Sequence, residues 1–157
     1  PDDLLRQYFK HGVPIILMDL GVREWAVFQE DSWRLDKLQQ RYGKLSVSVE
    51  HGRNSDPNYI ANGAELSERT AFGDFLRRLQ SRERESNDYY ITANNFLFRQ
   101  PGFSPMLRDI SPLYSGFMQP PDPREGGASA DIWMGPKGTV TPLHQDATSL
   151  LYTQVAG

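Results

Sequence analysis

The chain has 157 residues, with 17 basic and 20 acidic side chains and a formal net charge of −3, so its overall charge does not favour a nucleic-acid partner. No apolar run approaches the roughly 18 residues that span a bilayer, and the first residues lack the order of a secretory signal, so we expect one soluble, cytoplasmic domain without a membrane segment. Cysteine is absent, which excludes disulfides and cysteine-rich zinc sites and leaves His, Asp and Glu as the strong metal ligands.

The first half of the chain alternates between helical and strand patterns. Helices are predicted where apolar residues repeat at helical spacing, over residues 2–12, 33–43 and 66–86. Gly12 ends the first of them, and Ser32 has the chemistry of an N-cap for the second. Residues 13–20 predict a largely buried strand and residues 44–52 an alternating one. The polar residues 51–65 are typical of a surface loop.

The second half begins with a strand pattern at residues 89–92 and continues with a long irregular connection, residues 101–127, that offers one short helical turn near 106–110. We assign Trp133 to the core. Three short strands in hairpin arrangement are then predicted, with a first turn at Pro136, Lys137 and Gly138, over residues 130–135, 139–146 and 149–157. This order predicts an α+β fold whose second half is a sheet or barrel.

We interpret residues 1–157 as a single domain. Residues 1–87 would form an N-terminal decoration of helices and strands, and residues 88–157 the first part of a β-barrel core. The last predicted strand ends in apolar residues with no partner beyond it, so we expect a fragment whose sheet is incomplete at its C-terminus.

The stretch TVTPLHQD, residues 139–146, contains the residues with the clearest chemistry. On an extended strand residues i and i+2 face the same side, so His144 and Asp146 would project together. An imidazole and a carboxylate placed this way can bind one divalent metal, and another histidine would complete a facial triad. These ligands leave iron, manganese, cobalt and zinc open. The bare motif is short enough to arise by chance, and a structural His–Asp hydrogen bond is its alternative interpretation.

The surrounding residues add context. Residues 131–157 contain Trp-x-Gly-Pro, then Gly-Thr-x-Thr-Pro-x-His-x-Asp, then Gln-Val-x-Gly. This order closely resembles the cupin-8 branch of the jumonji-C (JmjC) oxygenases, and upstream segments resemble the family more diffusely. The resemblance implies a double-stranded β-helix (cupin) core and an Fe(II)- and 2-oxoglutarate-dependent oxygenase, a hydroxylase that uses dioxygen.

The resemblance also implies roles for single residues. His144 and Asp146 match the first two iron ligands, Thr141 matches a hydroxyl that contacts 2-oxoglutarate, and Tyr90 matches a tyrosine that reaches the far carboxylate of that cosubstrate. Tyr152 shares the facing of His144 on an extended chain, so we place it in the cofactor-binding wall. Thr141 has the opposite facing, and a bulge near the following proline would be needed to turn it inward. Leu150 stands where several peptide-hydroxylating relatives have asparagine, which departs from the family pattern.

The other metal-site residues of the family do not match this chain. Its second histidine comes many tens of residues after His-x-Asp, and its cationic partner for 2-oxoglutarate follows Gln-Val-x-Gly. The remaining histidines, His11 and His51, both lie upstream of the motif. We therefore expect the parent protein to be the enzyme and this stretch alone to be inactive.

Two alternatives remain open. One is a non-catalytic cupin-like binding or regulatory module in which the His–Asp pair is structural. The other is a different metal-dependent cupin enzyme, such as a hydrolase or isomerase that uses zinc or manganese. The substrate is unknown, with a peptide side chain or a small molecule favoured, and a homodimer is also left open.

Overall fold

The computed structural model describes residues 2–18, 21–52, 67–81, 88–114, 130–139, 141, 144–146 and 150–157. Two strands pair antiparallel, with Ser46 opposite Ala71 at one end and Glu50 opposite Ser67 at the other. The elements in chain order are α1 (Asp2–His11), η1 (Val22–Glu24), α2 (Ala26–Gln29), α3 (Leu35–Tyr42), β1 (Ser46–Glu50), β2 (Ser67–Ala71), α5 (Phe72–Gln80), η3 (Ala93–Asn95), η4 (Leu97–Arg99) and η5 (Ser104–Tyr114).

Helices α3 and α5 pack against each other beside the sheet. Gly73, in the first turn of α5, permits this approach because a Cβ atom there would lie 2.4 Å from the Nε2 atom of Gln39. The backbone N–H of Gly73 donates to the carbonyl of Gly43 at 2.9 Å, and that of Phe72 donates to Leu45 at 2.8 Å. These bonds fix the start of α5 to the end of α3.

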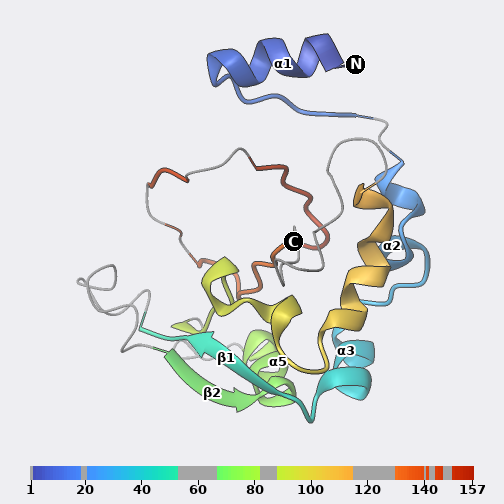
Figure 1. Cartoon of the computed structure of the whole chain (residues 1–157). Helices are drawn as coiled ribbons and strands as arrows, with labels where there is room; N and C mark the ends of the chain where they lie inside the picture. Colours follow the sequence, from blue (N-terminus) through green and yellow to red (C-terminus); the bar gives the residue numbers. More distant parts are fainter. Residues whose placement is uncertain are drawn as a thin grey trace.

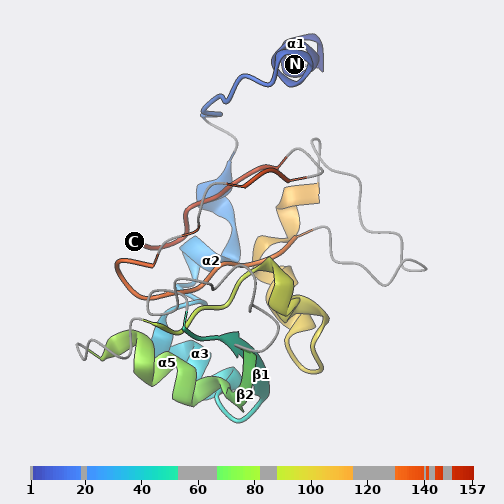
Figure 2. The same ribbon diagram turned by 90° about the vertical axis from the view of Figure 1, so that its left-hand side faces the viewer.

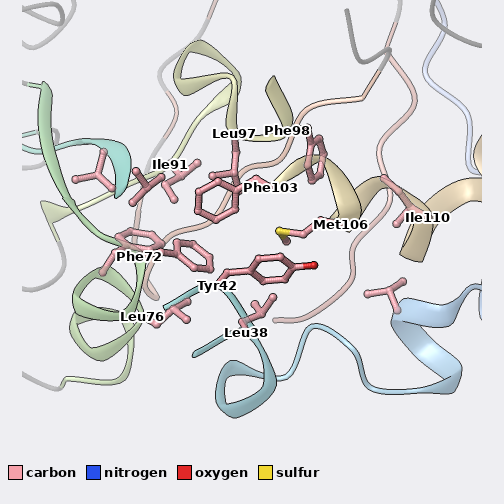
Figure 3. Packing of buried hydrophobic residues seen from close by; sticks show 14 of the residues in the cluster. Leu38, Tyr42, Phe72, Leu76, Ile91, Leu97, Phe98, Phe103, Met106 and Ile110 are labelled. Atoms are coloured by element: carbon pink, nitrogen blue, oxygen red, sulfur yellow. The ribbon is translucent and has the colours of Figure 1, made fainter. Parts of the chain in front are cut away.

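The core is largely aromatic and is enclosed by the sheet, α3, α5 and η5 (Figure 3). The ring of Phe103 meets Phe72 edge to face at 5.1 Å and stacks on Tyr42 at 5.8 Å. Phe72, Phe103 and Met106 are fully buried. Burial of each such side chain contributes about 1.5–3 kcal/mol, so this cluster is a main source of stability.

Helix α1 confirms the first predicted helix and ends before Gly12, whose φ is +61°. Figures 1 and 2 show α1 set apart from the sheet and the other helices. The prediction of a buried strand after it is wrong for residues 13–18, which have no regular structure, and Ile16 is 92% exposed. Pro14 has no N–H for a ladder, and no strand in the described part of the chain pairs with this segment.

The second and third predicted helices are corrected at their N-terminal ends. Ser32 is not the N-cap: the backbone N–H of Arg34 donates to Asp31 in a turn, and α3 begins only afterwards. The prediction of one helix over residues 66–86 is wrong at its start, because residues 67–71 form β2 and α5 begins at Phe72. Pairing with β1 overrides the local helical pattern there. No helix within the described ranges has the length and apolar character to cross a membrane.

The later predictions are met in part. Residues 89–92 contribute two single bridges instead of a ladder, and η5 extends well beyond the one turn predicted near residues 106–110. Most of the predicted loop at residues 51–65 and the end of the connection at 101–127 lie outside the described residues.

The three C-terminal strands are not formed in the described residues after 129, where Met134 makes the only strand-like bridge. A strand needs a neighbouring segment that satisfies its backbone hydrogen bonds. Among the described residues after 129, only Met134 has such a neighbour, which is Ile91. The turn after Pro136 is confirmed by a bond from the N–H of Thr139 to the Pro136 carbonyl at 3.3 Å. Trp133 is 38% exposed instead of being in the core. The β-helix core stays a prediction.

Candidate metal centre

An extended segment, Tyr90 to Thr92, connects the core to the residues that lead into the candidate site. The backbones of Glu50 and Tyr90 exchange hydrogen bonds of 2.8 and 2.9 Å, and those of Ile91 and Met134 exchange two bonds of 2.9 Å. Ile91 is fully buried. Met134, one residue before the Gly-Pro turn, is thereby fixed to the core.

The Gly-Pro turn is shaped by its contact with Tyr90. A Cβ atom on Gly135 would lie 2.5 Å from the Cδ2 atom of the Tyr90 ring and 2.9 Å from the hydroxyl oxygen of Thr139. That hydroxyl donates to the carbonyl of Pro136 at 2.9 Å. Gly138 has a φ of +92°, which favours glycine. Packing therefore explains the glycine at position 135, and backbone conformation explains the one at position 138.

His144 and Asp146 come next, and the structure brings their side chains together. The Nε2 atom of His144 lies 3.5 Å from the Oδ2 atom of Asp146, and the two side chains are 51% and 44% exposed. This distance exceeds that of an ordinary N–H···O hydrogen bond. Two donor atoms bound cis to one cation at about 2.1 Å each lie about 3.0 Å apart. The nitrogen and oxygen donors thus fit one divalent cation after a small adjustment.

Within the described ranges no group of three His, Asp, Glu or Cys side chains is placed to hold a metal. His11 lies at the exposed end of α1. His51 is half-buried, with its ring centroid 6.1 Å from that of Tyr89. The role of His144 and Asp146 as metal ligands stays a prediction.

The predicted cosubstrate residues occupy different environments. Tyr90 is half-buried and packs on Gly135, whereas Thr141 is exposed. Tyr152 is 68% exposed, and its ring lies 5.8 Å from that of Trp133. Tyr90 therefore packs against the turn, and Tyr152 lies beside Trp133. The cofactor-binding roles of Thr141, Tyr90 and Tyr152 stay predictions.

Three buried polar residues beside the extended segment were not predicted as functional: Glu50, Thr92 and Asn95. Among these three residues only Glu50 has a sequence signal, which is weak: it directly follows the alternating apolar residues of β1. Asp131 lies in the segment that leads to the turn. Burial raises the pKa of its carboxyl above 3.8, and the charge of Arg99 partly opposes that shift.

The described helices and two-stranded sheet agree with the α+β class of fold that the sequence predicts. The whole chain, residues 1–157, matches the family described as Cupin-like domain and belongs to it. The resemblance to jumonji-C proteins is thus confirmed, and the described part of this domain combines helices with a two-stranded antiparallel sheet.

Named relatives agree with this assignment. The chain is 28% identical to JmjC domain-containing protein D of Dictyostelium discoideum over 99% of its own length and 36% of that protein. It is 29% identical to Lysine-specific demethylase JMJ30 of Arabidopsis thaliana over 99% of its length and 33% of that protein. It is 26% identical to Lysine-specific demethylase 8 of Danio rerio over 85% of its length and 30% of that protein. The chain spans about a third of the length of these curated relatives. No solved structure matches it.

Proposed function

We propose that this cupin-like domain belongs to an Fe(II)- and 2-oxoglutarate-dependent oxygenase that hydroxylates a C–H group of its substrate. The observation that carries the proposal is the approach of His144 Nε2 and Asp146 Oδ2 to 3.5 Å within the family motif. Two relatives are named lysine-specific demethylases, which favours a peptide side chain over a small metabolite as the substrate.

His144 and Asp146 would hold the iron as two neighbouring ligands. Both are about half exposed, so an ion can reach them from solvent. His144 binds metal in its neutral form and Asp146 as a carboxylate, which makes affinity fall in acid. The third ligand of the triad is not among the described residues, and we propose that another part of the full-length protein supplies it.

When bound, the iron and 2-oxoglutarate supply the oxidising chemistry, in which dioxygen is consumed and the cosubstrate becomes succinate and carbon dioxide. The side chains of this domain would bind the cosubstrate and orient it. The hydroxyl of Thr141 and the phenol of Tyr90 would donate hydrogen bonds to the cosubstrate carboxylates. Such hydrogen bonds are strong because the acceptor is charged. Tyr152 contributes to the same wall.

The test is an anaerobic titration of the full-length protein with Fe(II) and 2-oxoglutarate, followed by the weak visible charge-transfer band. We expect the band in the wild type, its loss in His144→Ala and Asp146→Ala, and its retention in His11→Ala, a histidine variant away from the motif. A wild type without the band, indistinguishable from His144→Ala, would exclude the proposal.

A second candidate is a non-catalytic cupin-like module, which the same pair also supports because 3.5 Å lies within ion-pair range. In that case His144→Ala changes the stability of the fold, while the wild type binds neither Fe(II) nor 2-oxoglutarate.

A third candidate is a zinc or manganese enzyme of another reaction class. Iron-dependent turnover of 2-oxoglutarate by the full-length protein would exclude this candidate.

A further inference from the structure

A buried polar network lies directly behind the extended segment. Glu50, Thr92 and Asn95 are 5%, 4% and 8% exposed. The hydroxyl of Thr92 donates to the Oε1 atom of Glu50 at 2.5 Å, and the backbone N–H of Thr92 donates to the Oδ1 atom of Asn95 at 2.7 Å. The side-chain amide of Gln100 donates to the Asn95 carbonyl at 2.7 Å. The Glu50 side chain is therefore held inside the core by a hydrogen bond from Thr92.

This network reaches the same three residues that connect the core to the candidate site. Glu50 bonds Tyr90 through the backbone and Thr92 through its side chain, so it binds the segment at two points. Ile91, between them, bridges to Met134. The ring of Tyr90 then packs on Gly135, where the turn toward His144 begins.

Stability alone does not account for a carboxylate at this place. Burying a polar side chain is costly, and well-packed apolar residues of similar volume are often as stabilising as a buried polar group. A hydrogen bond between Glu50 and Thr92, in contrast, fixes direction, because it restricts rotation of the backbone that carries Tyr90. The neighbouring side chains of β1, Val47 and Val49, fill the core without such a bond.

We infer that Glu50 and Thr92 are positioning residues: their buried hydrogen bond sets the orientation of Tyr90 and, through the Ile91–Met134 bridge, the start of the turn. This inference rests on the proposed function, in which Tyr90 binds a carboxylate of 2-oxoglutarate. It predicts that breaking the bond weakens cosubstrate binding and leaves metal binding at His144 and Asp146 unchanged.

The experiment measures three quantities in the full-length protein: the Kd for Mn(II), a redox-inert substitute for iron, the Kd for 2-oxoglutarate in the presence of Mn(II), and the melting temperature. Thr92→Val keeps the side-chain volume and removes the donor. We expect its 2-oxoglutarate Kd to rise severalfold, up to about tenfold if the whole free energy of one hydrogen bond is lost from binding, with an unchanged Mn(II) Kd. Thr92→Ser keeps the hydroxyl and should restore the wild-type Kd.

Val49→Ala is the matched control, because Val49 is a fully buried neighbour on β1 whose side chain forms no hydrogen bond. It should lower the melting temperature and leave the 2-oxoglutarate Kd unchanged. If Thr92→Val does not fold, Thr92→Ala replaces it, since the smaller side chain leaves room for a water molecule to bond Glu50. The same rise in Kd is then expected.

Two outcomes would overturn the inference, and they are distinguishable. A Thr92 variant that lowers the melting temperature but binds 2-oxoglutarate as tightly as the wild type would show that the network is only structural. A wild type that binds Mn(II) but no 2-oxoglutarate would remove the proposed function, and the inference with it.

Discussion

Gly135→Ala tests the packing of the Tyr90 ring on the turn. The added Cβ atom would lie 2.5 Å from Cδ2 and 2.8 Å from Cε2 of the Tyr90 ring, and 2.9 Å from the hydroxyl oxygen of Thr139. Real Cβ atoms essentially never lie within 3.0 Å of such atoms, so the ring or the turn must shift. Overpacking of this kind costs about 1–3 kcal/mol in the free energy of unfolding.

A double-mutant cycle with Tyr90→Ala isolates the contact. Urea unfolding of the full-length protein, followed by tryptophan fluorescence, gives the free energy of each variant. Because Tyr90→Ala removes the ring, Gly135→Ala should cost at least about 1 kcal/mol less in that background, and the remaining cost reports the contact with Thr139. An exposed neighbour, Lys137→Ala, should stay within about 0.5 kcal/mol of the wild type. Equal costs of Gly135→Ala in both backgrounds would refute the proposed packing of the ring on the turn.

Two further predictions concern other parts of the domain. Asp109 is 7% exposed and accepts a 2.9 Å hydrogen bond from the indole Nε1 of Trp33, so Asp109→Ala should lower the free energy of unfolding by about 1.5–3 kcal/mol in a urea titration. Arg34→Ala, which loses an exposed ion pair, should lower the free energy of unfolding much less than Asp109→Ala, and equal losses would contradict the burial argument. Burial raises the pKa of Asp131, so its charged form opposes folding above the ordinary value of 3.8, and the penalty disappears as pH falls below that value. Asp131→Asn should therefore melt at a higher temperature than the wild type at pH 7 and lose this advantage near pH 3, whereas a constant difference across that range would argue against the shifted pKa.

Local sequence patterns predicted the elements whose conformation is determined by residues close together in the sequence. The helical spacing before Gly43 corresponds to α3, the alternation of Val47 and Val49 to β1, and the Pro136 turn to a backbone hydrogen bond. In each case the residues that determine the conformation are neighbours in sequence. These predictions fail only at element ends, as at Ser32, where a turn delays the first helical residue.

Elements that depend on distant partners were not predictable in this way. Residues 67–71 form a strand because β1 lies beside them, although their own pattern favours a helix. Residues 13–18 have a strand pattern without a described partner and stay irregular. At the candidate site the spacing of His144 and Asp146 predicted their approach, but the burial of Glu50 and its bond to Thr92 arise from long-range packing that no local pattern contains.

The arrangement of the described residues also suggests how metal binding and folding would be linked. Met134 and Val155 are half-buried against the core, whereas His144 and Asp146, between them in sequence, are about half exposed. Figures 1 and 2 show this C-terminal segment lying above the sheet, on the side toward α1. A cation that binds both donors would hold the side chains of His144 and Asp146 together. Because a cation that binds the folded state stabilises it by mass action, metal binding would raise the melting temperature of the domain.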